Sequence, residues 1–243
     1  MKSLVIVLSV VFACGGLSAQ TFVWQPSPGH TQVRIWPGTP PHVTPVPGPE
    51  YATNEPTGTG QTWVSVNNVS QPTMTVYSPK GTNTGVAVVV FPGGGYSCLA
   101  IDIEGTEICD WLNSRGITAV LLKYRVPVKK VGPYGESCRP DFAIALYPGH
   151  LWNEDKGFKL NPNVPVTTKT PPTFLLQNED DHVDNINDAL VYYIALKNTG
   201  VPVEFHSYAQ GGHAFGLRPT KFPVTRWPQL AETWLKTIGM IPQ

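Results

Sequence analysis

The chain has 243 residues, of which 41% are hydrophobic, and its 17 basic residues balance its 17 acidic residues, so the formal net charge is zero. A chain of this length suits one domain of α/β size with a full hydrophobic core. The neutral charge balance, with no run of Lys or Arg, argues against nucleic acid as a partner and favours a small or neutral substrate.

The N-terminus has the pattern of a secretory leader. Residues 1–19 begin with one early lysine, Lys2, continue with an apolar run over residues 4–13 and end in small residues. The apolar run is too short for a transmembrane helix, and no later stretch is long enough to span a bilayer. We therefore expect cleavage near Ala19, a secreted or periplasmic protein, and no membrane association after cleavage.

Three cysteines follow the leader, namely Cys98, Cys109 and Cys138. They allow one disulfide within the chain at most, and their spacing leaves its pairing open. Buried small apolar thiols are the favoured interpretation. No C-x-x-C pair and no set of histidines has metal-ligand spacing, so we expect neither a metal nor a cofactor.

Residues 25–56 contain nine prolines and no apolar period. Such a segment favours extended geometry and does not join a central ladder, so we expect an extended tether or an arm that wraps the domain. Of the two, a spacer between leader and domain is favoured. We therefore predict a leader over residues 1–19, a Pro-rich extended segment over 20–60 and a folded domain over 61–243. Trp24 and Trp36 are candidates for docking on that domain.

The folded region alternates strands and helices. A continuous run of β-branched residues over 86–91 is followed by three glycines, and such a run is typical of a parallel strand covered on both faces. We predict a mostly parallel, doubly wound α/β sheet with helices on both faces. The expected strands are 62–66 paired antiparallel with 74–76, then 86–91, 117–122, 141–147, 173–176 and 203–208, and the expected helices are 104–114, 185–198 and one starting at Pro228.

Three polar or glycine-rich features lie at strand ends, where doubly wound sheets carry their sites. The sequence FPGGGY follows the strand over 86–91, the pair Asp180 and Asp181 follows a later strand, and His213 follows the last strand after two glycines. Glycine lets backbone N–H groups approach a ligand. An acid followed by a histidine, each after a late strand, is the order of the α/β-hydrolase triad, and a glycine-rich loop after an early strand is typical of its oxyanion hole.

The segments FPGGGY, NEDDHVD and AQGGHAFGL followed by WPQLAETWL resemble the secreted α/β-hydrolases related to acetylxylan esterases and other bacterial carbohydrate esterases. This resemblance implies serine acyl transfer on a small ester or an acetylated polysaccharide. It makes Gly94 and Gly95 the oxyanion donors, His213 the general base and Asp181 the acid. Asp180 remains the alternative acid, and capping of the next helix is an alternative role for one of the two aspartates.

The nucleophile elbow G-x-S-x-G that the family needs is missing. It belongs between the strands over 117–122 and 141–147, which are joined here by only 17 residues, 124–140. A crossover between parallel strands needs about a dozen residues, so this segment is long enough to connect the two strands. It is too short to contain a further strand, a nucleophile elbow and the helices that flank them. Ser137 in GESCR is a weak candidate nucleophile without a preceding strand, and Ser97 in the glycine loop is no better.

We therefore hypothesise an internal deletion, either natural or a sequence-assembly artefact, which leaves an α/β-hydrolase-like sheet without its nucleophile strand and flanking helices. We expect the strand over 86–91 to pair directly with residues 142–146. Three functions stay open: an ester hydrolase, a poorly folded product whose strand edges aggregate, and a non-catalytic carbohydrate-binding remnant. The remnant would use Trp24, Trp36, Tyr96 and Trp152 as stacking surfaces.

Overall fold

The computed structural model describes residues 20–36, 38, 48–57, 60–126 and 140–243. The predicted leader over residues 1–19, together with Ser137 and Cys138, lies outside the described residues. Within the described ranges, no helix is long and apolar enough to cross a membrane.

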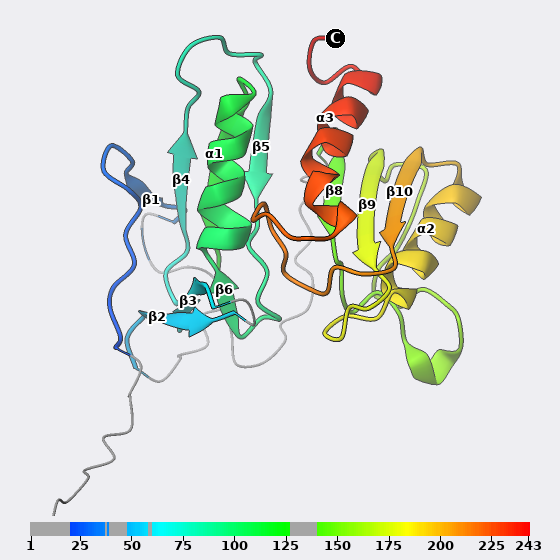
Figure 1. The fold of residues 1–243 in the computed structure, drawn as a ribbon, viewed down its shortest axis with the longest axis horizontal. Helices are drawn as coiled ribbons and strands as arrows, with labels where there is room; N and C mark the ends of the chain where they lie inside the picture. Colours follow the sequence, from blue (N-terminus) through cyan, green and yellow to red (C-terminus); the bar gives the residue numbers. More distant parts are fainter. Residues whose placement is uncertain (1–19, 37, 39–47, 58–59, 127–139) are drawn as a thin grey trace, which may run out of the picture.

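The first half of the molecule is built on a mixed sheet with the strand order β1-β4-β7-β5 (Figure 1). β4 runs antiparallel to both β1 and β7, whereas β5 and β7 are parallel. Helix α1 connects β5 to β7 and follows a short π-helical turn, η1, so the predicted strand–helix–strand unit is present. The bounds are β1 (Gln32–Arg34), β4 (Thr73–Tyr77), β5 (Ala87–Val90), η1 (Asp102–Thr106), α1 (Glu107–Ser114) and β7 (Thr118–Lys123).

A small antiparallel sheet, β2-β3-β6, packs beside the first sheet. Its strands are β2 (Tyr51–Pro56), β3 (Thr62–Asn67) and β6 (Cys98–Ala100). Our prediction that β3 and β4 pair with each other is wrong. The chain turns at Asn68, whose φ is +55°, and this turn carries the two strands into different sheets.

The Pro-rich segment is not simply a spacer, so that favoured prediction is wrong, whereas the alternative, an arm that wraps the domain, agrees with the structure. It contributes β1 and β2, each at the edge of its sheet, where proline costs no ladder hydrogen bond in the sheet interior. Trp24 is 8% exposed and belongs to the main core, while Phe22 bridges to Ala52. Packing against residues that are distant in sequence thus orders a segment that has no apolar period of its own.

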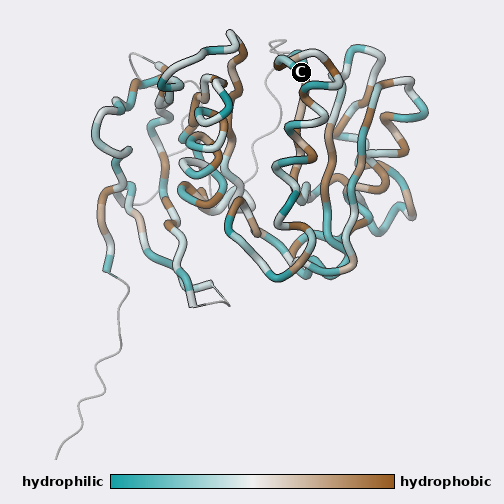
Figure 2. The backbone as a smooth tube through the Cα atoms, turned by 45° about the horizontal axis from the view of Figure 1, so that its top comes forward, coloured by the Kyte–Doolittle hydropathy of each residue, from teal (hydrophilic) through white to brown (hydrophobic). Residues whose placement is uncertain are grey.

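The second half of the molecule is an all-parallel sheet in the order β10-β9-β8. Helix α2 packs on one face of this sheet, where Leu196 and Leu175 belong to the same hydrophobic cluster. Helix α3 packs on the other face, where the ring centroids of Trp234 and Phe174 lie 5.7 Å apart. Figure 2 shows hydrophobic residues (brown) along these strands. The bounds are β8 (Ala143–Leu146), η2 (Glu154–Lys156), β9 (Thr173–Asn178), α2 (Asn187–Thr199), β10 (Val203–Tyr208), η3 (Pro223–Arg226) and α3 (Trp227–Thr237).

Strands β5 and β8 do not pair, so our prediction that residues 86–91 bond directly to residues 142–146 is wrong. In the described chain β5 has one partner, β7, and β8 has one partner, β9. In Figure 1 the two sheets stand apart, with β5 on one side of α3 and β9 and β10 on the other. The halves are fixed by a shared core that includes Leu99 and Ile101 from one and Phe174 and Trp227 from the other.

One face of the first sheet has no helix over it in the described part of the chain. α1 covers the face that carries Leu121, which is buried. The opposite face presents a row formed by Val76, Val120 and Val89 on adjacent strands, as their pairing register shows. Val76 is 45% exposed and Val89 is 51% exposed. An apolar row of this kind is typical of a sheet face against which a helix or another segment packs.

Candidate active site

His213 and Asp181 are joined by a hydrogen bond although they are 32 positions apart in sequence. The Nδ1 atom of His213 donates to Oδ2 of Asp181 over 2.8 Å. Both residues lie in loops that follow neighbouring parallel strands, β9 for Asp181 and β10 for His213, so the sheet itself brings them together. The Asp181 side chain is fully buried, and the His213 side chain is 19% exposed.

Asp181 is held by four donors. Its Oδ1 accepts from the backbone N–H groups of Val183 (2.9 Å) and Asp184 (3.1 Å). Its Oδ2 accepts from Gln177 Nε2 (3.2 Å) as well as from His213. Burial by itself raises the pKa of Asp181, but these hydrogen bonds outweigh it and lower the pKa below its ordinary value. The carboxylate is therefore ionised at neutral pH.

Asp180 makes a different contact from Asp181. Its Oδ1 accepts from the Gly212 N–H at 2.8 Å, and Asn178 Nδ2 donates to the Gly212 carbonyl at 2.9 Å. Asp180 thus fixes the loop that precedes His213, whereas Asp181 bonds the imidazole itself. The alternative that one of these aspartates caps the next helix is wrong, since the residue at the N-terminus of α2 is Ile186 and no side chain caps it.

The imidazole of His213 lies among negative charges. Burial alone lowers the pKa of His213, but the hydrogen bond to Asp181 and the charges of Asp181, Asp184 and Glu104 together raise it above its ordinary value. The second ring nitrogen, Nε2, lies 3.9 Å from Asp184 Oδ2. The Tyr147 ring packs against the imidazole, with 4.7 Å between ring centroids.

The glycine loop after β5 has a backbone that only glycine can adopt. Gly94 has φ +138°, and a Cβ atom there would collide with the carbonyl oxygen of Cys98. The Gly94 carbonyl accepts from the N–H groups of Ser97 (3.0 Å) and Cys98 (3.2 Å), which closes the turn. In the part of the chain that the structure describes, the N–H groups of Gly94 and Gly95 donate to no protein acceptor. These two donors are available to a ligand.

Within residues 20–126 and 140–243, as far as they are described, no serine or cysteine side chain bonds to His213: the hydrogen-bond and ion-pair partners of its ring nitrogens are the carboxylates of Asp181 and Asp184. The Ser97 hydroxyl lies near the Gly95 carbonyl at 3.5 Å, and Cys98 and Cys109 are free thiols. Ser137, the weak candidate from sequence, lies outside the described residues. The same described ranges hold no cluster of His, Cys, Asp and Glu that could bind a metal ion.

One of the four aromatic residues considered for sugar stacking is not available at the surface. Trp24 is buried, so a surface that includes it is excluded. Tyr96 is 51% exposed and lies 6.2 Å from the His150 ring, while the Trp152 indole N–H donates to the Gly157 carbonyl.

Comparison with known proteins agrees with this arrangement of strands and loops. No family model matches the chain. An acetylxylan esterase from Xylanibacter ruminicola (strain ATCC 19189) is 25% identical over 223 residues, which cover 64% of this chain and 46% of that protein. The crystal structure of an acetyl ester-xyloside bifunctional hydrolase from Caldicellulosiruptor lactoaceticus superposes with a TM-score of 0.62 at 27% identity, covering 72% of this chain and 90% of the other. The chain has an α/β-hydrolase-like fold and is similar in sequence to these two ester hydrolases.

Other solved structures support the same fold for this α/β-hydrolase. MGS-M1, an α/β-hydrolase enzyme from a deep-sea metagenome library, has a TM-score of 0.59 at 21% identity and covers 69% of this chain and 92% of the other. The carboxylesterase Cest-2923 from Lactobacillus plantarum has a TM-score of 0.57 at 15% identity and covers 81% and 100%. The chain spans about half the length of the curated relative that it matches, 46%.

Four side chains of this α/β-hydrolase site were not predicted from the sequence. Asp184 belongs to the quoted segment NEDDHVD, and its distance of three residues from Asp181 is the signal that it shares the same loop. Tyr147 ends the predicted strand over 141–147, a position where a site residue is plausible. Gln177 and Glu104 carry no local signal, because each meets the site only through residues distant in sequence.

Proposed function

We propose that this chain derives from an exported carboxylic-ester hydrolase of the acetylxylan esterase type, and that it keeps the acid–base half of the site without the serine nucleophile. The observation that carries this proposal is the 2.8 Å hydrogen bond between His213 Nδ1 and Asp181 Oδ2. The similarity to an acetylxylan esterase and to an acetyl ester-xyloside hydrolase supports an acetylated saccharide or a small ester as the substrate class.

Each retained group has a defined task in this proposal. His213 is the general base that takes the proton from the attacking group and returns it to the leaving alcohol, and Asp181 holds the imidazole in the tautomer with Nε2 free. Gly94 and Gly95 donate their N–H groups to the oxyanion of the tetrahedral intermediate. A donor of this kind contributes about 3 kcal/mol to stabilising the transition state.

Two observations support the deletion hypothesis. The edges of β5 and β8 are both unpaired in the described chain, which is where a further parallel strand would lie. The match to the acetylxylan esterase runs over 223 residues yet occupies 64% of the 243 residues of this chain, so the relative has residues inside the matched region that this chain lacks. Resequencing of the locus tests this part, since an uninterrupted longer reading frame means that the chain is not the native product.

Loss of the nucleophile leaves weak catalysis. In serine hydrolases without a working triad, binding and the oxyanion hole still give about 10³–10⁴-fold acceleration over water. That residual rate does not need the histidine, so His213 can add to it only as a general base on an attacking water. We expect slow hydrolysis of activated esters that His213 increases in this way and that is independent of Ser137.

The test is a p-nitrophenyl acetate assay of the purified chain beside His213→Ala and Ser137→Ala. The expected result is slow turnover that His213→Ala reduces and Ser137→Ala leaves unchanged. Turnover no higher than that of His213→Ala ends the esterase proposal for this chain. A large loss in Ser137→Ala shows instead that Ser137 is the nucleophile.

A further inference from the structure

Asn178 is bonded to both loops that carry the acid–base pair. It is the last residue of β9, and its side chain is buried. Its side-chain Nδ2 donates to the Gly212 carbonyl over 2.9 Å, and its backbone carbonyl accepts from the Asp181 N–H over 3.4 Å. The first bond reaches the residue before His213, and the second reaches the acid. One residue thus connects the histidine loop with the acid loop.

These contacts close a ring of bonds around the pair. The ring runs from Asn178 Nδ2 to the Gly212 carbonyl and along the peptide bond to His213. It continues through the bond from His213 Nδ1 to Asp181 and returns from the Asp181 N–H to the Asn178 carbonyl. The Gly212 carbonyl belongs to the planar peptide unit attached directly to the Cα atom of His213. The bond from Asn178 therefore limits the directions in which the imidazole can point.

Gly211 allows the Asn178 amide to come this close to the histidine loop. A Cβ atom at residue 211 would lie 2.4 Å from Asn178 Nδ2 and 2.8 Å from Val224 Cγ1. Both distances are too short for non-bonded atoms, so any side chain at this position would displace the amide or the loop. The glycine before Gly212 is thus required by the contact that Asn178 makes, and not by the turn alone.

Asparagine is a costly residue at this buried position. In the part of the chain that the structure describes, its Oδ1 is buried without a hydrogen-bond partner, and the bond to Gly212 is its one side-chain hydrogen bond. A buried polar atom without a partner costs free energy, whereas an apolar side chain of similar size carries no such cost. The advantage of asparagine here is the placement of the Gly212 carbonyl.

We propose that Asn178 is a positioning residue that holds the His213 imidazole in place to bond Asp181. This inference rests on the function proposed above, in which His213 is the general base. The bond to Asp181 fixes the imidazole in the tautomer that leaves Nε2 unprotonated, so an imidazole that turns away loses its basic nitrogen from the site. A displacement of about 1 Å at such a site can reduce the rate by about 10²-fold.

Asn113 offers a matched control. Its Nδ2 also donates to backbone carbonyls, those of Tyr77 at 2.8 Å and Ile117 at 3.0 Å, and it lies on helix α1. These bonds involve no residue of the histidine loop or the acid loop. Asn113→Ala therefore removes a comparable amide and weakens the fold without touching the pair. A change that appears only in Asn178 variants is an effect on the pair and not on general stability.

The experiment compares the wild type with Asn178→Leu, Asn178→Ala and Asn113→Ala by NMR. Two quantities are measured for His213: the pKa of its imidazole and the rate at which its Nδ1 proton exchanges with water. Both Asn178 variants should lower this pKa, because the bond to Asp181 is one cause of its elevation. They should also speed the exchange of the Nδ1 proton by at least about tenfold. Asn113→Ala should change neither quantity.

The inference is overturned if a folded Asn178 variant keeps both quantities at their wild-type values, or if Asn113→Ala changes them equally. Should both Asn178 variants lose cooperative unfolding, the wild type decides. There the side-chain amide protons of Asn178 should exchange at least about tenfold more slowly than those of the exposed Asn163, and equal rates contradict the inference. None of these measurements needs turnover, so a failed esterase assay counts against the proposed function and not against the role of Asn178.

Discussion

His213 Nδ1 donates to Asp181 Oδ2 over 2.8 Å, and the two residues follow adjacent parallel strands. The pair is fixed by the sheet β10-β9-β8 and by the local donors around Asp181, and it needs nothing from the interval between β5 and β8. Among the residues that the structure describes, the acid–base pair is therefore assembled without a nucleophile bonded to it.

Replacing the acid should have a much larger effect than replacing its neighbour. Asp181→Asn removes the charge that holds the His213 imidazole, so it should lower the pKa of His213 and reduce residual ester hydrolysis by about 10²-fold. Asp180→Asn keeps the imidazole contact and changes only the bond to the Gly212 N–H. The rates with p-nitrophenyl acetate and the NMR titration of His213 compare the two variants, and equal effects would contradict the assignment.

The pair also predicts how stability depends on pH. The pKa of His213 is raised above its ordinary 6.5, so its contribution to stability is complete below that value and is lost as the pH rises through the raised pKa of the folded state. The pKa of Asp181 is lowered from 3.8, so its contribution is present above that value and is lost as the pH falls through the lowered pKa.

The difference in unfolding free energy between the wild type and His213→Ala should accordingly shrink as the pH rises above neutrality. Urea denaturation at a series of pH values measures it. A difference that grows with rising pH would show that the pKa of His213 is lowered in the folded protein.

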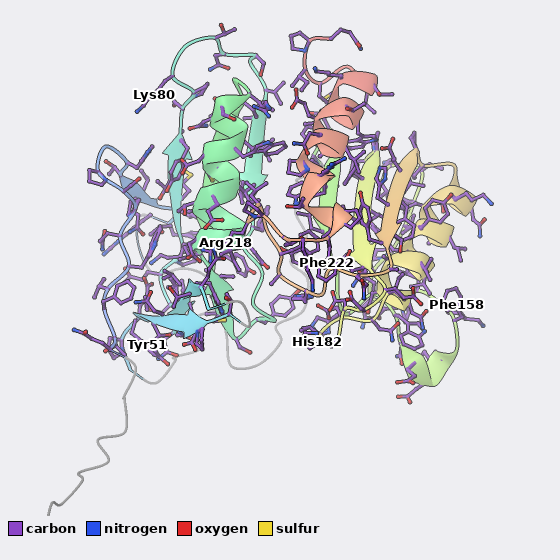
Figure 3. All side chains as sticks on the ribbon, viewed as in Figure 1. Tyr51, Lys80, Phe158, His182, Arg218 and Phe222 are labelled. Carbon is purple, nitrogen blue, oxygen red and sulfur yellow. The ribbon has the colours of Figure 1, made fainter. Side chains whose placement is uncertain are left out.

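Arg218 ties the histidine loop to the first half of the molecule (Figure 3). Its guanidinium donates to Glu107 at 2.7 and 2.9 Å, to Asp102 at 3.1 Å and to the Thr62 carbonyl at 2.7 Å. Arg218→Ala should lower the free energy of unfolding by about 1–3 kcal/mol, because these are charge-assisted bonds on a side chain that is 22% exposed.

The matched control for this loss is Arg115→Ala. Arg115 pairs with one carboxylate and is 38% exposed, so the expected loss is below about 1 kcal/mol. Urea denaturation of both variants gives the comparison. Equal losses would mean that the Arg218 contacts stabilise the fold no more than the single ion pair between Arg115 and Glu232 does.

The uncovered face of the first sheet should cause self-association. Val89→Lys places a charge in the exposed row formed with Val76 and Val120, so it should reduce association measured by light scattering at several protein concentrations. Ile194 on helix α2 is 40% exposed and lies outside this row, so Ile194→Lys serves as the control. An unchanged association in Val89→Lys would contradict the idea that this face is adhesive.

Local patterns predicted the elements well where each element carries its own period. The β-branched run before the glycines and the apolar spacing of the helices are local features, and the corresponding strands and helices are present. The pairing of β3 with β4 and the direct pairing of residues 86–91 with 142–146 failed, because register depends on neighbours that the chain brings in from elsewhere. The strands β1 and β2 of the Pro-rich segment were not predicted from the sequence, because their partners also lie in distant parts of the chain.

The candidate site divides in the same way. His213, Asp181 and the glycines stand out because they follow strands in a recognisable order. Glu104 and Gln177 lie within ordinary sequence and reach the site only through the fold. Their roles depend on distances between loops, which no single segment of sequence contains.

The central claim, an acid–base pair without an activated serine, is tested most directly by a fluorophosphonate probe and intact-mass spectrometry. Such a probe labels a serine only when a neighbouring base and an oxyanion hole activate it. The account predicts an unchanged mass after prolonged incubation. A single phosphonyl adduct that maps to Ser97 or Ser137 and disappears in His213→Ala would contradict it.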